Sequence, residues 1–363
     1  MEAQMKKCMV VLLVVLVATS TLFAAGASEK AAIQVVSSRG GQQSKFIPEF
    51  GTIPVPSKVY RIGVMEKTLI NDFWLDAKNG FEAAARDYGV TVEVFAAPTE
   101  SDLQAQANTM GDMLAKKFDM LCVSPITDTN LLNPLAKASQ MGIPIINSID
   151  AHIDEENQKK HDIDISAFIT VDFKENTKMS VRFIADKLNG AEGKVIHLMG
   201  LPGGRCAEER KMGYEEELAL NPNLKNVGVY NTEWDRKKAM DITADVLQSH
   251  PDLKGIVACN DDCALGAYQA VKNAGLAGKV LVTGVDATPD GIKSIMRGEL
   301  SATTAFFQYG LAYSSIEAAI LLLEGQFAGK PTVVYGPQEI WDAANVTSKV
   351  AQYREMYVGL KDL

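Results

Sequence analysis

Thiols and imidazoles are scarce in this chain of 363 residues. Its five cysteines are too few for a disulfide framework, and no two of them form a Cys-x-x-Cys pair. The four that follow the amino-terminal segment are Cys122, Cys206, Cys259 and Cys263. We expect these to be buried free thiols, with a Cys259–Cys263 disulfide as the alternative. The four histidines are scattered, without metal-ligand spacing, so no metal site is predicted.

Signatures of catalysis are also missing. The sequence has neither a Gly-x-Ser-x-Gly nucleophile elbow nor a His-Glu-x-x-His metal motif. Residues 325–330 approach a phosphate-binding loop, but their glycine spacing is wrong and the Ser or Thr is absent. Asp261 and Asp262 resemble an acid–base pair, yet helix capping explains them more simply. We therefore expect a protein that is not an enzyme and that uses no cofactor.

Basic residues are outnumbered: 36 Lys and Arg stand against 45 Asp and Glu, which gives a net charge of −9. An acidic chain has no electrostatic reason to bind nucleic acid or an anionic membrane surface. A DNA-binding repressor would carry a basic helix-turn-helix near its amino terminus. This chain has an apolar segment there instead.

Long apolar runs are limited to one, Met9–Val17, which follows two lysines and precedes the small residues Ala25-Gly26-Ala27. This pattern predicts a secretory signal peptide at residues 1–27 and an exported protein. An uncleaved segment that tethers the protein to the membrane is the alternative. Residues 28–58 lack periodicity and are rich in Gly, Ser, Gln and Pro, so we predict a flexible tether there.

From Val59 onward, short apolar runs alternate with helical patterns. The first expected helix, residues 72–88, places Trp74 and Phe81 on one stripe and ends at Gly89. A strand–helix–strand series predicts a parallel sheet with helices on both faces. The series starts again near residue 167. The sequence therefore predicts two α/β units.

The stretch 255–291 contains two polar residues that follow neighbouring strands. Asn260 follows the expected strand at 255–259, and Asp286 follows the one at 280–285. Open α/β sheets bind ligands at the carboxyl ends of their strands. Taken alone, each residue is explained more simply as the cap of the next helix.

The first unit repeats this arrangement. Ser124 and Asp150 also follow successive strands, and the separation between them equals that between Asn260 and Asp286. Sequence identity between the two units is low, so the repetition is one of pattern. Two similar lobes with polar groups at their strand ends are what a ligand cleft between domains requires.

Several motifs in this order resemble the sugar-type periplasmic binding proteins of bacterial ABC importers. They are Asn71-Asp72-Phe73-Trp74, Ser124-Pro125, Gly142-Ile143-Pro144, Gly213-Tyr214, Trp234-Asp235-Arg236, Asn260-Asp261 and Asp286 with Thr288-Pro289-Asp290-Gly291. The resemblance covers residues 60–347. It implies a type I fold, in which two doubly wound parallel-sheet lobes are joined by three crossover strands. The implied N-terminal lobe is 59–170 plus 305–333, and the C-terminal lobe is 171–304 plus 334–363.

The resemblance also implies roles for individual residues. Asn71, Asn260 and Asp286 would hydrogen-bond hydroxyl groups of the ligand, and Asp150 would bind a pair of them. Phe73 and Trp74 would cover one face of a sugar ring, and Trp234 the opposite face. Core packing is the alternative reading of Phe73 and Trp74, because Trp74 lies on the apolar stripe of its helix.

The sequence departs from the ribose-type pattern at positions that would contact the ligand. Ribose-type proteins have an arginine directly after the acid that Asp150 matches, and this chain has Ala151 there. Glu208 aligns with a second arginine of that pattern. Phe306 aligns with an expected glutamine, with Gln308 two residues further on. We include Ser124, Glu208 and Gln308 among the candidate ligand residues, and we expect Arg210 to hold structure. A more acidic site is therefore expected, suited to a sugar other than ribose, a polyol or an amino-bearing ligand.

The resemblance implies a monomeric periplasmic protein that closes its lobes on a sugar or polyol. It would then deliver the ligand to the permease of an ABC importer. One alternative stays open at this point. A sensor protein of the same architecture would present a sugar, a nucleoside or an autoinducer-like molecule to a chemoreceptor or a sensor kinase.

Overall fold

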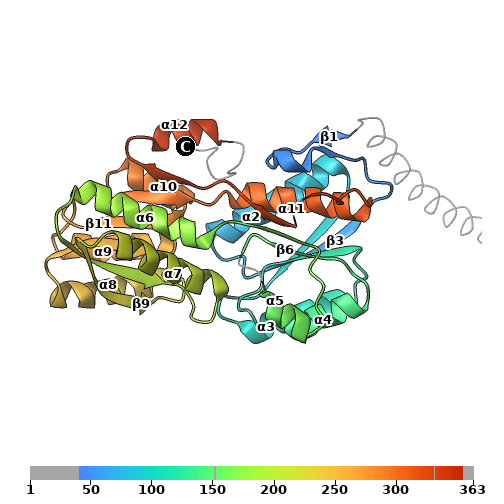
Figure 1. The fold of residues 1–363 in the computed structure, drawn as a ribbon, viewed down its shortest axis with the longest axis horizontal. Helices are drawn as coiled ribbons and strands as arrows, with labels where there is room; N and C mark the ends of the chain where they lie inside the picture. The colour runs from blue at the N-terminus through green and yellow to red at the C-terminus, as the bar shows by residue number, and fades with distance from the viewer. Residues whose placement is uncertain (1–40, 151–152, 331, 355–363) are drawn as a thin grey trace, which may run out of the picture.

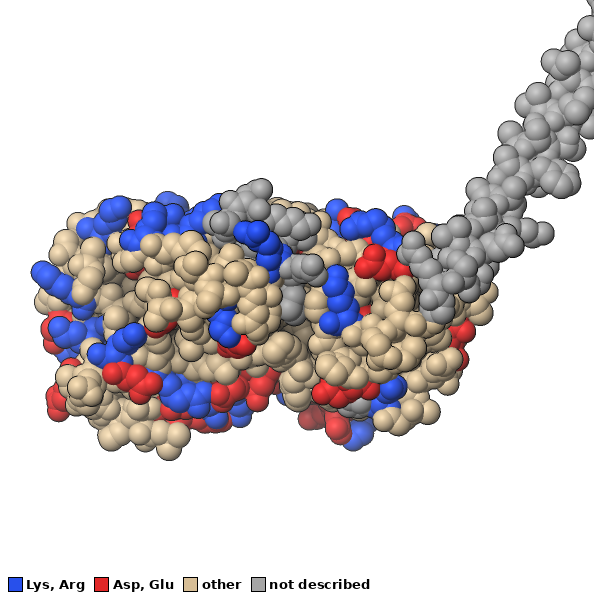
Figure 2. Space-filling model, turned by 90° about the horizontal axis from the view of Figure 1, so that it is seen from above, with Lys and Arg blue, Asp and Glu red and all other residues tan. Residues whose placement is uncertain are grey.

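The computed structural model describes residues 41–150, 153–330 and 332–354. Two six-stranded sheets, each covered by helices, form two lobes that lie side by side along the long axis (Figure 1). Acidic and basic side chains occur over both lobes on the face shown in Figure 2. The predicted signal peptide, residues 1–27, lies outside the described residues.

The first lobe contains an all-parallel sheet. Its strands are β3 (Arg61–Glu66), β4 (Thr91–Ala96), β5 (Met120–Val123), β6 (Ile145–Ser148), β7 (Ala167–Thr170) and β13 (Val333–Tyr335). Its helices are α2 (Asp72–Tyr88), α3 (Leu103–Leu114), α4 (Leu132–Gln140), α5 (Glu155–Lys160) and α11 (Gln308–Leu323). The strand order is β13-β7-β6-β5-β3-β4, and α11 packs along α2. Parallel neighbours require crossover connections, which the helices supply.

The second lobe repeats this plan with one antiparallel edge strand. Its strands are β8 (Gly193–Met199), β9 (Leu224–Asn231), β10 (Leu253–Ala258), β11 (Leu281–Asp286), β12 (Ala302–Ala305) and β14 (Glu339–Asp342). Its helices are α6 (Phe173–Leu188), α7 (Arg205–Leu220), α8 (Arg236–Ser249), α9 (Asp261–Asn273), α10 (Pro289–Met296) and α12 (Val346–Gln352). The order is β14-β12-β11-β10-β8-β9, with β14 antiparallel to β12.

The chain passes between the lobes three times: from β7 to α6, from β12 to α11 and from β13 to β14. This topology confirms the predicted fold class. Two expected boundaries are slightly wrong. The segment 305–333 was assigned to the first lobe, yet Ala305 is the last residue of β12 and pairs with Asp286 in the second sheet. The segment 334–363 was assigned to the second lobe. Val334 and Tyr335 pair with Ile169 and Thr170 in the first sheet, so the third crossing begins only after them.

Residues 41–58, which we call the strap, are packed on the first lobe. β1 (Gln42–Gln43) and β2 (Thr52–Ile53) form a short antiparallel ladder, with the 3-10 helix η1 (Pro48–Phe50) between them. Phe50 and Ile53 are fully buried. The prediction of a flexible tether at 28–58 is therefore wrong for this part, while residues 28–40 lie outside the described residues.

Polar residues at the strand ends also begin the helices. The side chains of Asn71, Asp172, Asp235, Asn260 and Thr288 each accept a hydrogen bond from a backbone N–H in the first turn of the next helix. This satisfies one of the N–H groups that a helix start leaves without a partner. Capping thus fixes these strand-end side chains at the edge where the two sheets face each other.

Buried free thiols are found at all four cysteines of the described chain, as predicted. No helix in the described ranges combines the length and the hydropathy needed to cross a bilayer.

Candidate functional site

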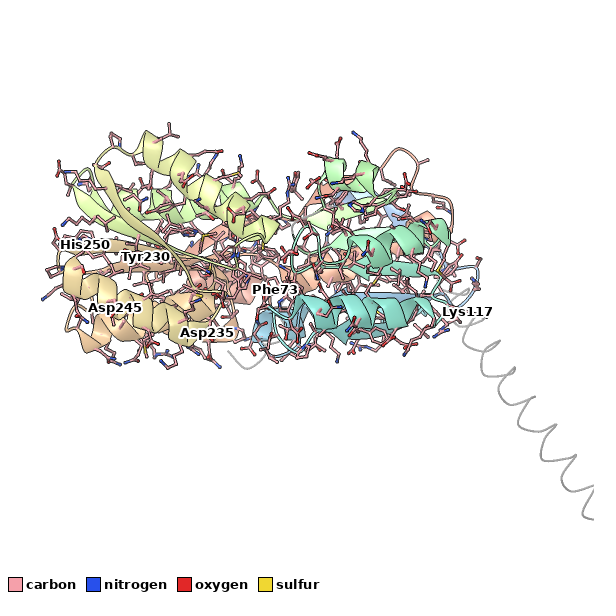
Figure 3. The ribbon with its side chains drawn as sticks, turned by 90° about the horizontal axis from the view of Figure 1, so that it is seen from below. Phe73, Lys117, Tyr230, Asp235, Asp245 and His250 are labelled. Carbon is pink, nitrogen blue, oxygen red and sulfur yellow. The ribbon has the colours of Figure 1, made fainter. Side chains whose placement is uncertain are left out.

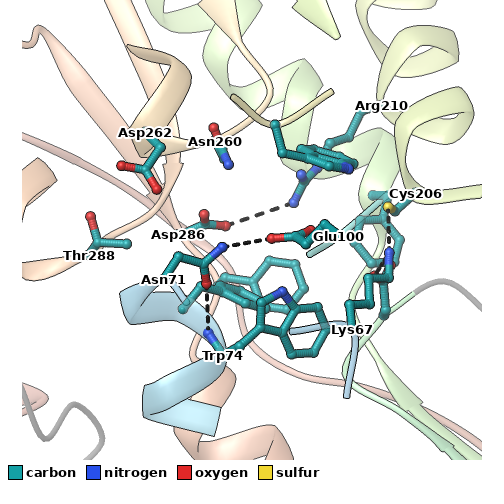
Figure 4. Close-up of a pocket in the computed structure, with 15 residues that line it drawn as sticks. Lys67, Asn71, Trp74, Glu100, Cys206, Arg210, Asn260, Asp262, Asp286 and Thr288 are labelled. Carbon is teal, nitrogen blue, oxygen red and sulfur yellow. Dashed lines mark hydrogen bonds and ion pairs between the residues drawn. The ribbon is translucent and has the colours of Figure 1, made fainter. Parts of the chain in front are cut away.

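A pocket with an empty volume of about 480 Å³, including its open mouth, lies between the lobes (Figure 4). It lies at the carboxyl ends of the central strands, and both lobes line it. Figure 3 shows Phe73 and Asp235 near the junction of the lobes, far from Lys117 and His250 at the distal ends. The first lobe contributes Lys67, Asn71, Phe73, Trp74, Glu100 and Asp150. The second lobe and the crossovers contribute Phe173, Cys206, Arg210, Trp234, Asn260, Asp262, Asp286, Thr288 and Phe306.

Aromatic rings form a large part of the pocket wall. The Phe73 ring meets Trp74 edge-on at 4.9 Å between centroids and Phe306 at 5.1 Å. Phe173 lies 5.7 Å from Phe306 on the side of the second lobe. Trp234 packs flat against Gly200, where a Cβ would come within 2.1 Å of the indole. Only glycine at that position leaves room for the indole.

Asn71 has two functions at the start of α2. Its Oδ1 accepts the Trp74 amide at 3.2 Å, and its Nδ2 donates to Glu100 Oε1 at 2.7 Å. Burial raises the pKa of Glu100, although Lys67 and the Asn71 hydrogen bond act in the opposite direction. The capping bond and the Glu100 bond together fix the orientation of the amide at the pocket wall.

A buried ion pair joins Lys67 and Asp150 in the first lobe. Lys67 Nζ also lies 3.7 Å from Cys206 Sγ of the second lobe. Burial disfavours the ammonium, but the attraction of Asp150, together with those of Cys206 and Glu100, outweighs this effect and raises the pKa of Lys67. The pair offers both a hydrogen-bond donor and an acceptor to the pocket.

Arg210 is the second cation of the pocket. Its Nη1 donates to the Cys259 carbonyl at 2.7 Å, and its Nη2 lies 4.0 Å from Asp286 Oδ1. The guanidinium lies over the rings of Phe173 and Trp234, at 5.3 and 5.5 Å from their centroids. Its Nε is buried and has no partner among the described residues. This arrangement leaves a donor for a bound molecule.

Asn260 and Asp286 come from neighbouring strands of the second lobe. Asn260 Oδ1 accepts the Cys263 amide at 2.8 Å, so the residue is both a helix cap and part of the pocket lining. Burial raises the pKa of Asp286 well above its ordinary value, and the nearby Arg210 only partly offsets this. For Asn260, the predicted role as a helix cap and the predicted place in the ligand site are therefore compatible.

The structure brings seven of the ten predicted site residues to the pocket. They are Asn71, Phe73, Trp74, Asp150, Trp234, Asn260 and Asp286. The other three do not line the pocket and are hydrogen-bonded elsewhere. The Ser124 hydroxyl donates to the Ser148 carbonyl at 2.7 Å inside the first sheet. Glu208 Oε1 accepts the Gly203 amide at 3.3 Å, and Gln308 Nε2 donates to Asp76 Oδ2 at 3.2 Å.

Other lining residues were not among the predicted site residues. Lys67 directly follows β3, so the strand-end argument used for Asn260 would have found it. Glu100 lies further along, in the segment between β4 and α3. Arg210 lies within α7, away from any strand end, so the strand-end argument does not indicate it. We expected it to hold structure, and it does so while also lining the pocket. The lining holds two cations, Lys67 and Arg210, and four carboxyl groups, so acidic side chains outnumber basic ones in the pocket.

Metal binding finds no support in the described chain, where no three His, Cys, Asp or Glu side chains come together in a metal-holding group. The lining instead combines aromatic faces with hydrogen-bond donors and acceptors. Such a lining suits an uncharged molecule that carries both apolar C–H faces and several polar groups.

Curated relatives of the chain bind sugars according to their names. The D-allose-binding periplasmic protein of Escherichia coli is 38% identical over 242 residues, which are 67% of this chain and 78% of the relative. The ribose import binding protein of Bacillus subtilis is 29% identical over 269 residues, or 74% of this chain and 83% of the relative.

Solved structures agree with the fold. A periplasmic solute-binding protein of an ABC transporter from Actinobacillus succinogenes, with bound D-allose, superposes with a TM-score of 0.75. It is 29% identical, and the match covers 80% of this chain and 99% of that one. A solute-binding protein from Agrobacterium vitis with bound D-fucose gives 0.74 at 25% identity, covering 80% and 98%.

The family model described as periplasmic binding protein domain matches residues 62–327. This range includes the strands of both lobes up to α11, and with them all fifteen residues of the pocket. The chain is a member of the periplasmic binding protein family.

Proposed function

We propose that this protein captures an uncharged monosaccharide or polyol in the interlobe pocket and delivers it to an ABC import permease. The observation that carries the proposal is the lining itself. Aromatic rings from both lobes face a set of charged and amide side chains within one pocket. A pyranose fits such a lining, because its C–H faces pack on rings while its hydroxyl groups bond to carboxylates.

D-allose is our first candidate ligand. It appears in the names of both a curated relative and a solved structure that align with most of this chain. The cation–carboxylate pairs of the pocket also favour a neutral, hydroxyl-rich ligand. Each charged group can exchange part of its ion-pair contact for a charge-assisted hydrogen bond to a hydroxyl.

Transport follows from the two-lobe architecture. Since each lobe supplies only part of the lining, a ligand gains most when both lobes touch it at once. The closed form is the one that a permease would recognise. We propose that the protein acts as a monomer in the periplasm, exported by the signal peptide at residues 1–27.

The test is a ligand screen on purified protein without residues 1–27. Thermal unfolding is measured with D-allose, D-ribose, xylitol, myo-inositol, nucleosides and amino acids, and each hit is titrated by calorimetry. A ligand at a hundred times its Kd adds about 2.7 kcal/mol, which raises Tm by several degrees. We expect stabilisation by a sugar or polyol, with D-allose foremost. Stabilisation by only a nucleoside or an amino acid contradicts the proposal.

Two variants connect any stabilisation to this pocket. Trp234→Ala removes an aromatic face and Asp286→Asn replaces one carboxyl oxygen by an amide nitrogen, so each is expected to weaken binding about tenfold or more. Asp245→Asn is the control, since Asp245 is exposed at the distal end of the second lobe (Figure 3). If both pocket variants bind the ligand with unchanged affinity, the pocket is not the binding site.

A further inference from the structure

The turn that presents Asp286 to the pocket has a strained backbone. Asp286 and Ala287 have φ angles of 111° and 53°, in a region that residues with side chains adopt rarely. Thr288, which follows them, lines the pocket and caps α10. Such a conformation persists only where surrounding groups hold it in place. We call residues 286–288 the ligand turn.

The Asp261 carboxylate accepts the hydrogen bonds that hold the ligand turn in this conformation. Its Oδ2 accepts the Thr288 amide at 2.7 Å and the Thr288 hydroxyl at 3.0 Å. Its Oδ1 accepts the Thr303 hydroxyl of β12 at 2.7 Å. The oxygen of that hydroxyl accepts the Ala287 amide at 3.2 Å. The carboxylate therefore fixes the backbone of the turn directly at Thr288 and through Thr303 at Ala287.

The surrounding structure makes room for this carboxylate. Asp261 is fully buried, although it does not line the pocket. A Cβ added at Gly284 or at Gly291 would lie 2.2 Å from an Asp261 oxygen. Two glycines, one on β11 and one on α10, thus leave the space that the carboxylate occupies. An acid at a helix start gains its electrostatic benefit at the surface and needs no such enclosure.

We propose that Asp261 is a positioning residue for ligand binding, which locks the ligand turn so that Asp286 faces the pocket. The proposal rests on the sugar-binding function proposed above, but it concerns a residue that touches no ligand. Removing Asp261 leaves two backbone N–H groups and two hydroxyls without their present arrangement. The turn is then free to relax its strain, and Asp286 loses its fixed direction.

The charge state of Asp261 gives a second readout. Burial raises its pKa to about 7, against the lowering effect of the Thr303 and Thr288 hydrogen bonds. The charged groups that act on it are Asp262 on its own helix and Asp286 on β11. Asp290 lies in the first turn of α10, Arg210 lies beside Asp286, and β12 contributes the uncharged Thr303. A protonated Asp261 accepts fewer hydrogen bonds, so affinity is expected to fall as the pH falls through 7.

The experiment compares Asp261→Asn with the wild type in two independent measurements. Titration with D-allose at pH 8 is expected to show at least a tenfold rise in Kd, with a flatter pH dependence between 6 and 8 than the wild type shows. Hydrogen exchange of the segment 281–292 without sugar is expected to become faster. Exchange of β9, at the far edge of the same sheet, and of the first-lobe strands β4 and β5 is expected to stay unchanged.

Controls separate positioning from general destabilisation. Asp290→Asn removes an exposed carboxylate from the first turn of α10, next to the ligand turn, and is expected to bind like the wild type. Should Asp261→Asn fail to fold, Thr303→Val and Thr303→Ser replace it, because only serine keeps the hydroxyl that joins Asp261 to Ala287. Serine is expected to preserve affinity and valine to weaken it.

Two results overturn the inference. One is an unchanged D-allose affinity in both Asp261→Asn and Thr303→Val. The other is an unchanged exchange rate in segment 281–292. A wild type that binds no sugar would contradict the proposed function instead, and the exchange measurement would still decide whether Asp261 holds the turn.

Discussion

Glu66 ends β3 with a carboxyl group that has no exposed surface, and neither of its oxygens has a hydrogen-bond partner in the described chain. Its neighbour Lys67 points into the pocket, since successive residues of a strand point to opposite faces. Burial raises the pKa of Glu66 well above its ordinary value, and the attraction of Lys78 offsets this only in part. The group is therefore a buried neutral acid whose ionisation opposes folding.

Replacing Glu66 by Gln is expected to stabilise the protein at high pH. The folded state holds the proton more tightly than the unfolded state does, so the stability of the wild type falls as the pH rises above the unfolded pKa. Glu66→Gln cannot ionise and is expected to gain about 1–3 kcal/mol at pH 8, with little difference at pH 4.5. Urea unfolding at both pH values measures this. A surface variant, Glu155→Gln, serves as the control, and an equal loss of stability at both pH values would contradict the account.

The sequence predicts some pocket residues and misses others for physical reasons. Asn260 and Asp286 were accessible because strand ends and helix caps have local signatures. Arg210 was not, because its place in the pocket depends on a hydrogen bond from α7 to the Cys259 carbonyl, 49 residues further along the chain. Ser124 shows the converse, since a correct strand-end position still leaves the hydroxyl bonded inside the sheet.

At the scale of elements, the strap is held to α11 by one buried carboxylate. Glu317 accepts the Ser44 hydroxyl at 2.6 Å, the Lys45 amide at 2.9 Å and the Tyr88 hydroxyl at 2.8 Å. These contacts join residues far apart in sequence, and no periodic pattern announces them. That is why residues 41–58 read as a linker, whereas the regular alternation of β3 to α12 was predictable.

Glu317→Gln is expected to loosen the strap without changing ligand affinity. An amide nitrogen in place of one oxygen faces a donor, so about 1–3 kcal/mol of stability is lost. Urea unfolding gives the stability, and limited proteolysis followed by mass spectrometry shows whether cleavage begins within residues 41–58. Ser44→Ala removes a single hydrogen bond and is expected to have a smaller effect in the same direction. A strong loss of D-allose binding in either variant would contradict this separation of strap and pocket.

At the scale of the whole molecule, the two lobes touch across the pocket. Lys67 of the first lobe reaches Cys206 of the second, and Phe73 meets Phe306 at a crossover. Direct contacts across the pocket indicate that the two lobes are closed on each other in this structure. Since the described chain passes between the lobes at three crossings and each sheet belongs to one lobe, separation of the lobes requires bending at these crossings rather than unfolding of either sheet.

Ligand binding is therefore expected to make the molecule more compact. Small-angle X-ray scattering of the chain without residues 1–27 measures the radius of gyration with and without D-allose. We expect a decrease on addition of the sugar, because only the closed form offers contacts from both lobes. Asp286→Asn should require more sugar for the same decrease. A ligand that binds tightly without any change in radius would show that the free protein is already closed.

Two late elements of the chain, α11 and β13, belong to the first lobe, and they determine when that lobe can finish folding. The first sheet begins with β3 near residue 61, yet its edge strand is residues 333–335, and α11 packs along α2. A chain that emerges from its amino terminus therefore cannot finish its first lobe until almost the whole second lobe has appeared. This topology delays the completed native state until synthesis of the chain is nearly over.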